Sequence, residues 1–130
     1  MSASTRYTEG LAKLEEIDGA AGRKVIDSLQ AIAPDLARYV IEFPFGDIYQ
    51  RPGLDLAQRE LATVAALTGL GHCQPHLAVH VHGALNVGCH PEQIIEVVIQ
   101  MAVYAGFPAA LNGMYTVKTV FAERGLLPDA

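Results

Sequence analysis

Helical spacing of the apolar residues, interrupted by glycine and proline, is the feature that most constrains the fold of this chain. Apolar side chains recur every three or four residues over nearly the whole length, and the alternation typical of a half-buried strand is rare. Glycine and proline divide the pattern into segments of helical length. The sequence therefore predicts an all-α protein, a single-domain helical bundle of about five to seven helices.

The helix boundaries follow from the same residues. Asp18-Gly19 and Ala33-Pro34 end the first two predicted helices, Gly46 to Gly53 reads as a turn-rich loop, and Pro91 suits a first helical turn. The expected helices are 8–17, 21–32, 35–45, 56–70, 74–85, 91–104 and 109–124. We expect residues 1–53 to form an N-terminal helical segment that packs on a helical core of residues 54–125, the two together being one domain.

The apolar content is high for a chain of 130 residues, because 51% of them are hydrophobic. A small monomer has too little interior to hide that much apolar surface. We therefore expect part of it to serve self-association, which makes a homo-oligomer the expected state.

Charge and hydropathy exclude two classes of partner. The formal net charge is -5, and no basic stripe is visible, so the sequence predicts no nucleic-acid partner. The longest apolar stretch, 97–111, contains Gln100, Gly106 and Pro108 and is too short to cross a bilayer. The N-terminus is polar, and two cysteines do not make a disulfide framework, so we expect a cytoplasmic protein with free thiols.

All five histidines and both cysteines lie between Gly71 and His90. Side chains three or four positions apart share one face of a helix, which places Cys73, His76 and His80 on one side. His82 lies about 200° around the helix from His80 and so points away from it.

Three kinds of chemistry fit that face. A thiolate with two imidazoles could bind zinc, although a structural zinc site needs a fourth ligand. A redox cycle needs a second thiol close to Cys73, and the second position of a C-x-x-C motif is His76 here. A histidine can also transfer a proton near neutral pH. Some of the histidines could instead be packed or interface groups.

Several separate blocks, in order, resemble the carboxymuconolactone decarboxylase family, which also contains the AhpD-type alkylhydroperoxidases. The match covers about residues 54–123. It consists of "RELATVAALTGLG", "HLAVHVHGALNVG" and "PEQIIEVVIQMAVYAGFPAALNGM". Its most specific parts are Arg59-Glu60, His80 with the "GALNVG" that follows shortly after it, Glu96, and the "YAGFPAALN" that begins at Tyr104.

The resemblance implies an all-helical, AhpD-like fold whose subunits associate as a trimer or a hexamer. The peroxidase branch has a Glu, then C-x-x-C, then a His four residues after the second Cys. Counting back from His80, its two cysteine positions are Cys73 and His76 here, so one thiol is replaced. The decarboxylase branch has no C-x-x-C and matches this sequence better. A thiol peroxidase related to the alkylhydroperoxidases remains the alternative function.

The reaction implied by the resemblance removes CO₂ from a small carboxylated lactone. The electrons released by C–C cleavage flow into the conjugated lactone carbonyl, so neither a cofactor nor a metal is expected. The partner is thus a small carboxylate, which Arg59 or Arg51 would bind by paired hydrogen bonds. The structural alternatives are a salt bridge for Arg59 and a solvated loop charge for Arg51.

The proton for the product carbon is assigned to His80, with Glu60 as a second acid or as the group that orients His80. A glutamate on an Ala-rich, buried helix should be paired, and Glu60 could be only a structural ion pair. Tyr104 could donate a hydrogen bond to the enolate oxygen or simply pack at a helix end. Cys73 and His76 could line the substrate pocket.

Overall fold

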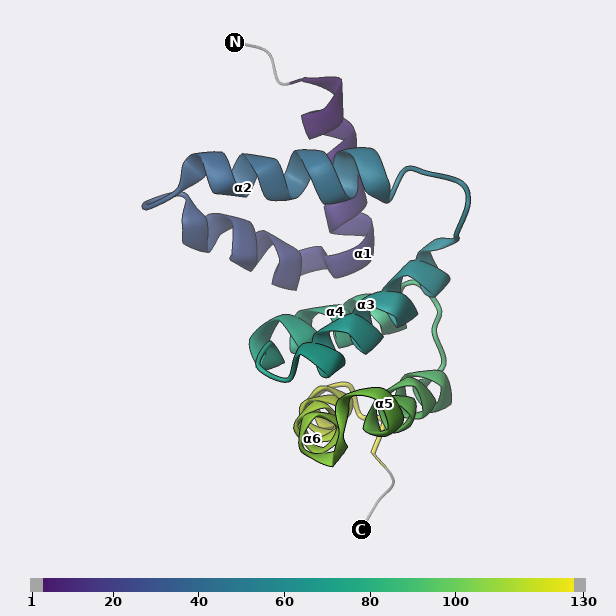
Figure 1. Ribbon diagram of the computed structural model, residues 1–130. Coiled ribbons are helices and arrows are strands. Elements are labelled where there is room, and N and C mark those ends of the chain that lie inside the picture. The colour runs from purple at the N-terminus through teal and green to yellow at the C-terminus, as the bar shows by residue number, and fades with distance from the viewer. Residues whose placement is uncertain (1–3, 128–130) are drawn as a thin grey trace. The chain divides into compact units, whose positions relative to one another are not determined.

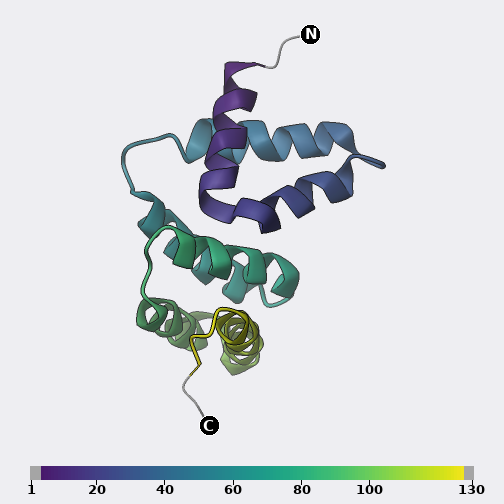
Figure 2. The same ribbon diagram turned by 180° about the vertical axis from the view of Figure 1, so that it is seen from behind.

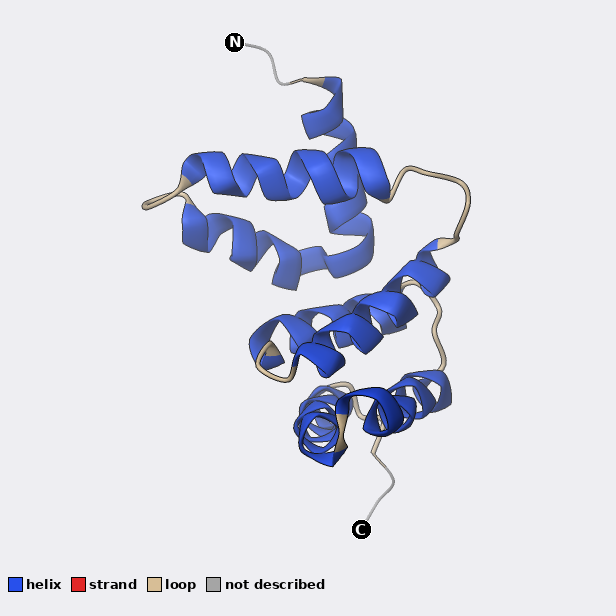
Figure 3. Cartoon of the chain, viewed as in Figure 1, coloured by secondary structure: helices blue, strands red, loops and turns tan. Residues whose placement is uncertain are grey.

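The computed structural model describes residues 4–127, and within this range the regular secondary structure is entirely helical (Figure 1, Figure 3). The prediction of an all-α protein is therefore confirmed. The chain divides into two compact units, Met1–Leu56 and Ala57–Ala130. No helix of the described range combines the length and the apolar character needed to cross a membrane.

The first unit consists of α1 (Thr5–Leu29), α2 (Pro34–Val40) and the π-helix η1 (Ile41–Ile48), which continues α2. The predicted break at Asp18-Gly19 is present as a kink, since Gly19 has φ 53° and ψ -133° inside α1. Helix α1 begins earlier than the predicted residue 8, because the Ser4 side chain accepts a hydrogen bond from the Tyr7 N–H and caps it.

The prediction of a loop from Gly46 to Gly53 was wrong at its start, because the helix continues to Ile48. Pro44 lies inside this segment and has no N–H to donate to a preceding carbonyl. The chain adopts the wider π register here, in which the Tyr49 N–H donates to the Pro44 carbonyl at 2.7 Å. A proline that ends an α-helix can therefore be accommodated by a change of helix type.

Two glycines allow α1 and η1 to approach within backbone contact. A Cβ atom on Gly10 would lie 2.2 Å from the Ile41 carbonyl oxygen, and one on Gly46 would lie 2.5 Å from the Arg6 carbonyl oxygen. Neither neighbour is a side chain that could rotate away. The two positions therefore require glycine for lack of space.

Replacing Gly10 with alanine is expected to lower the free energy of unfolding by about 3 kcal/mol, since the added methyl group forces two backbone segments apart. Urea unfolding followed by circular dichroism measures the change. Gly53→Ala is the control, because nothing lies within 4 Å of its Cβ position, and it should change stability by less than about 0.5 kcal/mol. Equal stability of the two variants would show that the α1–η1 contact is looser than described.

An ion pair also joins α1 to η1. The Arg6 guanidinium donates two hydrogen bonds to the Asp47 carboxylate, at 2.8 and 2.9 Å. The hydrogen bond from Arg6 and its positive charge lower the pKa of Asp47 below its usual value of 3.8.

This lowered pKa predicts a dependence of stability on acid. Because the folded pKa lies below the unfolded one, the pair's contribution is complete above pH 3.8 and is lost as the pH falls below it. The wild type should therefore exceed Asp47→Asn in stability at neutral pH, and the difference should shrink at lower pH. Thermal unfolding of both proteins between neutral and strongly acid pH tests this, and a constant difference would contradict it.

The second unit contains α3 (Leu56–Leu70), α4 (Gln74–Asn86), α5 (Pro91–Ala105) and α6 (Phe107–Glu123). Helices α5 and α6 lie side by side (Figure 2) and are separated only by Gly106, whose φ of 94° breaks the helix. The last helix begins at Phe107, before the predicted residue 109, because Pro108 fits its first turn.

The core of the second unit is mainly aliphatic and draws on all four helices. Helix α4 contributes Leu77, Val81 and Ala84, each at most 1% exposed. The remaining buried members are Val64, Cys89, Ile94, Val98, Val117, Val120 and Phe121. This core fixes the rotation of α3 and α4 about their axes, and so it decides which of their polar side chains can meet.

Candidate active site

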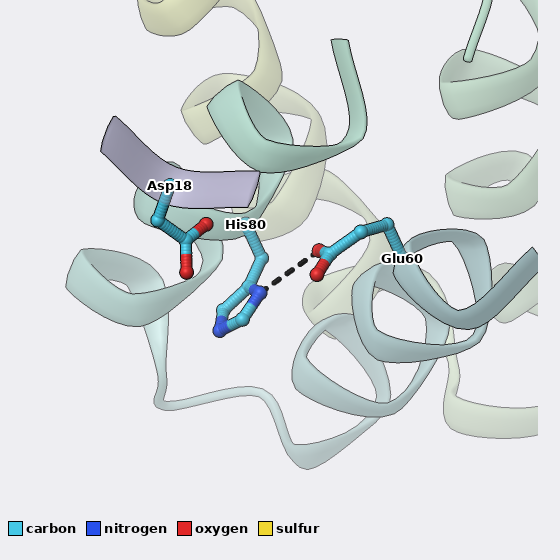
Figure 4. A group of neighbouring side chains, drawn as sticks. All are labelled: Asp18, Glu60 and His80. Carbon is cyan, nitrogen blue, oxygen red and sulfur yellow. Dashed lines mark hydrogen bonds and ion pairs between the residues drawn. The ribbon is translucent and has the colours of Figure 1, made fainter. Parts of the chain in front are cut away.

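A histidine–glutamate pair bridges α3 and α4. The Nδ1 atom of His80 lies 2.9 Å from Oε2 of Glu60, which is a hydrogen bond (Figure 4). The two residues are twenty positions apart in the sequence, and each follows from the register of its own helix. Glu60 shares a face of α3 with the buried Val64, and His80 adjoins the buried Val81 of α4.

The burial of Glu60 is unusual for a carboxylate. Its side chain is fully buried, and its Oε1 atom has no hydrogen-bond partner within residues 4–127. Burying a charged oxygen without a partner is costly, and a fold seldom retains such a group for stability alone. The pair with His80 was anticipated from the sequence, whereas the open Oε1 atom was not.

The hydrogen bond determines which nitrogen of His80 can react. When Nδ1–H donates to Glu60, the neutral ring carries its lone pair on Nε2, and protonation of the ring places an acidic proton there. The carboxylate stabilises that protonated form and fixes the orientation of the ring. The His80 side chain is 19% exposed, whereas its partner Glu60 is fully buried. This arrangement suits the transfer of one proton.

Arg59 precedes Glu60 on α3 and is half-buried, with its Nε atom shielded from solvent. Arg51 is exposed in the loop that follows η1. Of the two predicted carboxylate-binding residues, Arg59 is thus the one already withdrawn from water, where an ion pair with a substrate is stronger.

The other predicted pocket residues lie apart from the Glu60–His80 hydrogen bond. Cys73 is half-buried at the residue before α4, and His76 is exposed one turn further along. Tyr104 is 79% exposed at the end of α5, so it is not packed in this chain. Their contact with a substrate stays a prediction.

Three of the remaining histidines have structural surroundings. His82 points away from His80, as predicted, with Nε2 3.0 Å from Glu123 Oε2, and it accepts a hydrogen bond from Arg124 at 3.3 Å. His90 is the N-cap of α5. The Nδ1 atom of His72 lies 3.6 Å from the Cys73 sulfur.

The two cysteines lie at opposite ends of α4. Cys73 precedes this helix and Cys89 follows it. The 13 residues of α4 span about 20 Å. Disulfide formation requires Cα atoms within about 7 Å of each other. Cys89 is also buried, and its thiol donates to the Ala57 carbonyl. Within one chain, Cys89 therefore cannot act as the second thiol of a peroxidase cycle.

Two buried polar side chains were missed from the sequence. Asp18 was interpreted only as a helix end, and Thr68 was not singled out, yet they are 3% and 1% exposed. The sequence signal for their burial was their spacing from buried residues of the same helix. Asp18 occurs four residues from both Leu14 and Gly22, and Thr68 continues the series of Glu60 and Val64. A polar residue inside a buried stripe marks a position worth examining.

The fold and the site define an all-helical protein in which a buried glutamate is hydrogen-bonded to a partly exposed histidine. Comparison with known proteins gives the family. The model of the carboxymuconolactone decarboxylase family matches residues 34–118, which is more than half of the chain. The chain belongs to this family.

Two of the three similar proteins described next are decarboxylases by name. This chain is 28% identical to a 4-carboxymuconolactone decarboxylase of Acinetobacter baylyi. The alignment extends over 130 residues and covers 99% of this chain and 96% of the relative. The chain is 38% identical to a nitrosuccinic acid decarboxylase of Metarhizium robertsii over 62% of this chain and 57% of that protein. It is 31% identical to an uncharacterized 15.0 kDa protein of Paracoccus denitrificans over 74% of this chain and 72% of the relative.

Proposed function

We propose that this protein is a cofactor-free carboxy-lyase that removes CO₂ from a small carboxylic acid. The observation that carries the proposal is the 2.9 Å hydrogen bond between His80 and the fully buried Glu60. This bond holds one ring that can carry a proton in a fixed orientation, and decarboxylation needs a proton donor of this kind after the C–C bond has broken.

The names of the two decarboxylase relatives support a class of substrate. One substrate is a carboxylated unsaturated lactone and the other is a succinic acid that carries a nitro group. In both compounds an electron-withdrawing group within the molecule can accept the electron pair released with CO₂. A substrate of this kind needs no external electron sink, and so the protein's task is to bind an anion and deliver a proton.

Each group has a role in this scheme. Arg59 binds a carboxylate of the substrate, either the one that leaves as CO₂ or one that stays in the product. Protonated His80 donates its Nε2 proton to the carbon that has lost CO₂, and the neutral ring then recovers a proton from water. Glu60 holds the ring and stabilises its charged form. Cys73, His76 and Tyr104 would shape the substrate pocket.

Turnover by the purified protein tests the proposal. Chelator-treated protein is mixed with 4-carboxymuconolactone and, separately, with nitrosuccinic acid, and CO₂ release is followed. Release from either compound, proportional to protein concentration, supports a carboxy-lyase. If neither compound releases CO₂ at high protein concentration, neither is a substrate, and the carboxy-lyase proposal loses its strongest support.

We further propose that the chain assembles as a homo-oligomer, a trimer or a hexamer, through the second unit. Phe107, Leu111 and Tyr115 recur every four residues on α6 and are 73%, 49% and 63% exposed. Val103, 76% exposed, lies on the adjacent α5. Exposed apolar side chains that recur along one face of a helix are typical of an interface.

A charge placed on that surface should dissociate the oligomer. Leu111→Glu is expected to shift the mass in solution, measured by light scattering, toward that of a single chain, because it buries an unpaired carboxylate in the interface. Ala66→Glu adds the same charge at an exposed position of α3 and serves as the control. A wild-type protein that is already monomeric would overturn the proposal.

A further inference from the structure

Helices α2 and η1 carry apolar side chains on two faces. The inward face packs against α1 and contains Ala37, Ile41 and Phe45, each at most 5% exposed. The outward face, together with the residue two positions before α2, carries large apolar side chains that are between 50% and 83% exposed, namely Ile32, Leu36, Tyr39 and Phe43. The first unit needs only the inward face for its own packing, and the outward row is here called the α2–η1 stripe.

The spacing within the α2–η1 stripe indicates a helix as its partner. Its members follow one another at intervals of four, three and four residues. This is the spacing by which one helix packs along another. Single exposed apolar residues are common on a protein surface, whereas a row of large ones marks an interaction surface.

The exposed row on α6 has the length that such a partner requires. Phe107, Leu111 and Tyr115, here called the α6 stripe, span about 12 Å along their helix. The helical part of the α2–η1 stripe, from Leu36 to Phe43, spans about 10 Å. Both rows combine aliphatic and aromatic side chains, so the side chains of one can fill the spaces between those of the other.

Charges of opposite sign border the two stripes. Asp35, Arg38 and Glu42 lie beside the α2–η1 stripe, and two carboxylates with one guanidinium leave it a net negative charge. Asp35, at the start of α2, is the most exposed of the three, with 75% of its side chain open to solvent. Lys118 follows Tyr115 by three residues on α6 and is also exposed. The two stripes are thus complementary in charge as well as in length.

The positions of these charges favour one direction of packing. When two helices run in opposite directions, the start of one stripe meets the end of the other, and Asp35 then faces Lys118. Antiparallel pairing of either stripe with its own copy would place these charges against apolar side chains instead. A contact between unlike stripes therefore satisfies both charges, and a contact between like stripes satisfies neither.

We propose that the α2–η1 stripe of one copy of this chain packs antiparallel against the α6 stripe of a second copy, with an ion pair between Asp35 and Lys118. This contact rests on the proposed homo-oligomer and specifies which surfaces meet in it. Because each chain presents one stripe of each kind, the contact is head-to-tail, and a closed ring of copies covers every stripe.

Two substitutions, one in each stripe, test the head-to-tail contact. Tyr39→Glu disrupts the α2–η1 stripe and Leu111→Glu disrupts the α6 stripe, because each would bury an unpaired carboxylate. Since every contact uses one stripe of each kind, we expect each variant alone to show the mass of a single chain in light scattering. An equimolar mixture at high concentration should contain a complex of two chains, joined by the stripe that each variant keeps intact.

The other outcomes contradict the proposal in distinct ways. If each variant alone remains a dimer, the stripes pair with their own copies. If the Tyr39→Glu protein is as large as the wild type, the α2–η1 stripe takes no part in assembly. A mixture that contains only single chains would overturn the pairing of the two stripes. A wild type that is itself monomeric would overturn the homo-oligomer as well, which distinguishes its failure from that of the contact.

Exchange of the two charges tests the direction of packing. Asp35→Lys and Lys118→Asp should each raise the protein concentration at which the assembly is half dissociated by about tenfold, because like charges then face each other. A chain with both substitutions should return to within about threefold of the wild type. Lys24→Asp, at an exposed position of α1 outside both stripes, is the control and should leave this concentration unchanged. A double variant that assembles no better than either single variant would overturn the antiparallel contact.

Discussion

Replacing His80 with alanine is expected to lower kcat/KM for CO₂ release by about 10² to 10⁴-fold, because the substrate carbanion loses its proton donor. The substrate would still bind through Arg59, so the loss should fall on kcat more than on KM. Steady-state kinetics with the substrate identified by the turnover assay measures both constants.

The same helix provides a matched control. His82 is also hydrogen-bonded to a glutamate, Glu123, at 3.0 Å, but this glutamate is exposed at the end of α6. His82→Ala should therefore leave kcat/KM close to that of the wild type. Equal losses in the two variants would show that the histidines act through the stability of α4 and not through proton transfer. Full activity of His80→Ala would exclude its role as the acid.

The helices were predictable from the sequence because their limits depend on local chemistry. Asp18-Gly19 and Gly106 break the chain where the sequence indicates, since glycine alone enters the left-handed region without strain. The segment around Pro44 was not predictable in the same way. Its π-helix continues past Pro44 and packs against α1 at Gly10, a long-range contact that a local pattern does not reveal.

The candidate site was predictable only in part, for a related reason. Helical spacing placed His80 and His82 on different sides of α4, and a buried glutamate implied a partner, so the Glu60–His80 pair could be anticipated. Spacing also grouped His76 with His80, although His76 is exposed. The rotation of α4 is set by the packing of Leu77 and Val81, and this packing depends on the other helices.

Exchanging Glu60 for glutamine should separate activity from stability. The amide oxygen can still accept the hydrogen bond from Nδ1–H, but its neutral group no longer stabilises the protonated ring. We expect kcat/KM to fall by about 10 to 10²-fold. The free energy of unfolding should rise by about 1 kcal/mol, because a neutral amide is less costly to bury than a carboxylate with an unpaired oxygen.

Opposite signs of these two changes are the signature of a functional carboxylate, since a structural ion pair would lose stability when its charge is removed. Glu123→Gln makes the same chemical change at the exposed His82 contact and should alter neither quantity. A Glu60→Gln protein that is fully active and less stable would mean that Glu60 holds α3 and α4 together. The orientation of His80 would then have to come from the packing of its own helix.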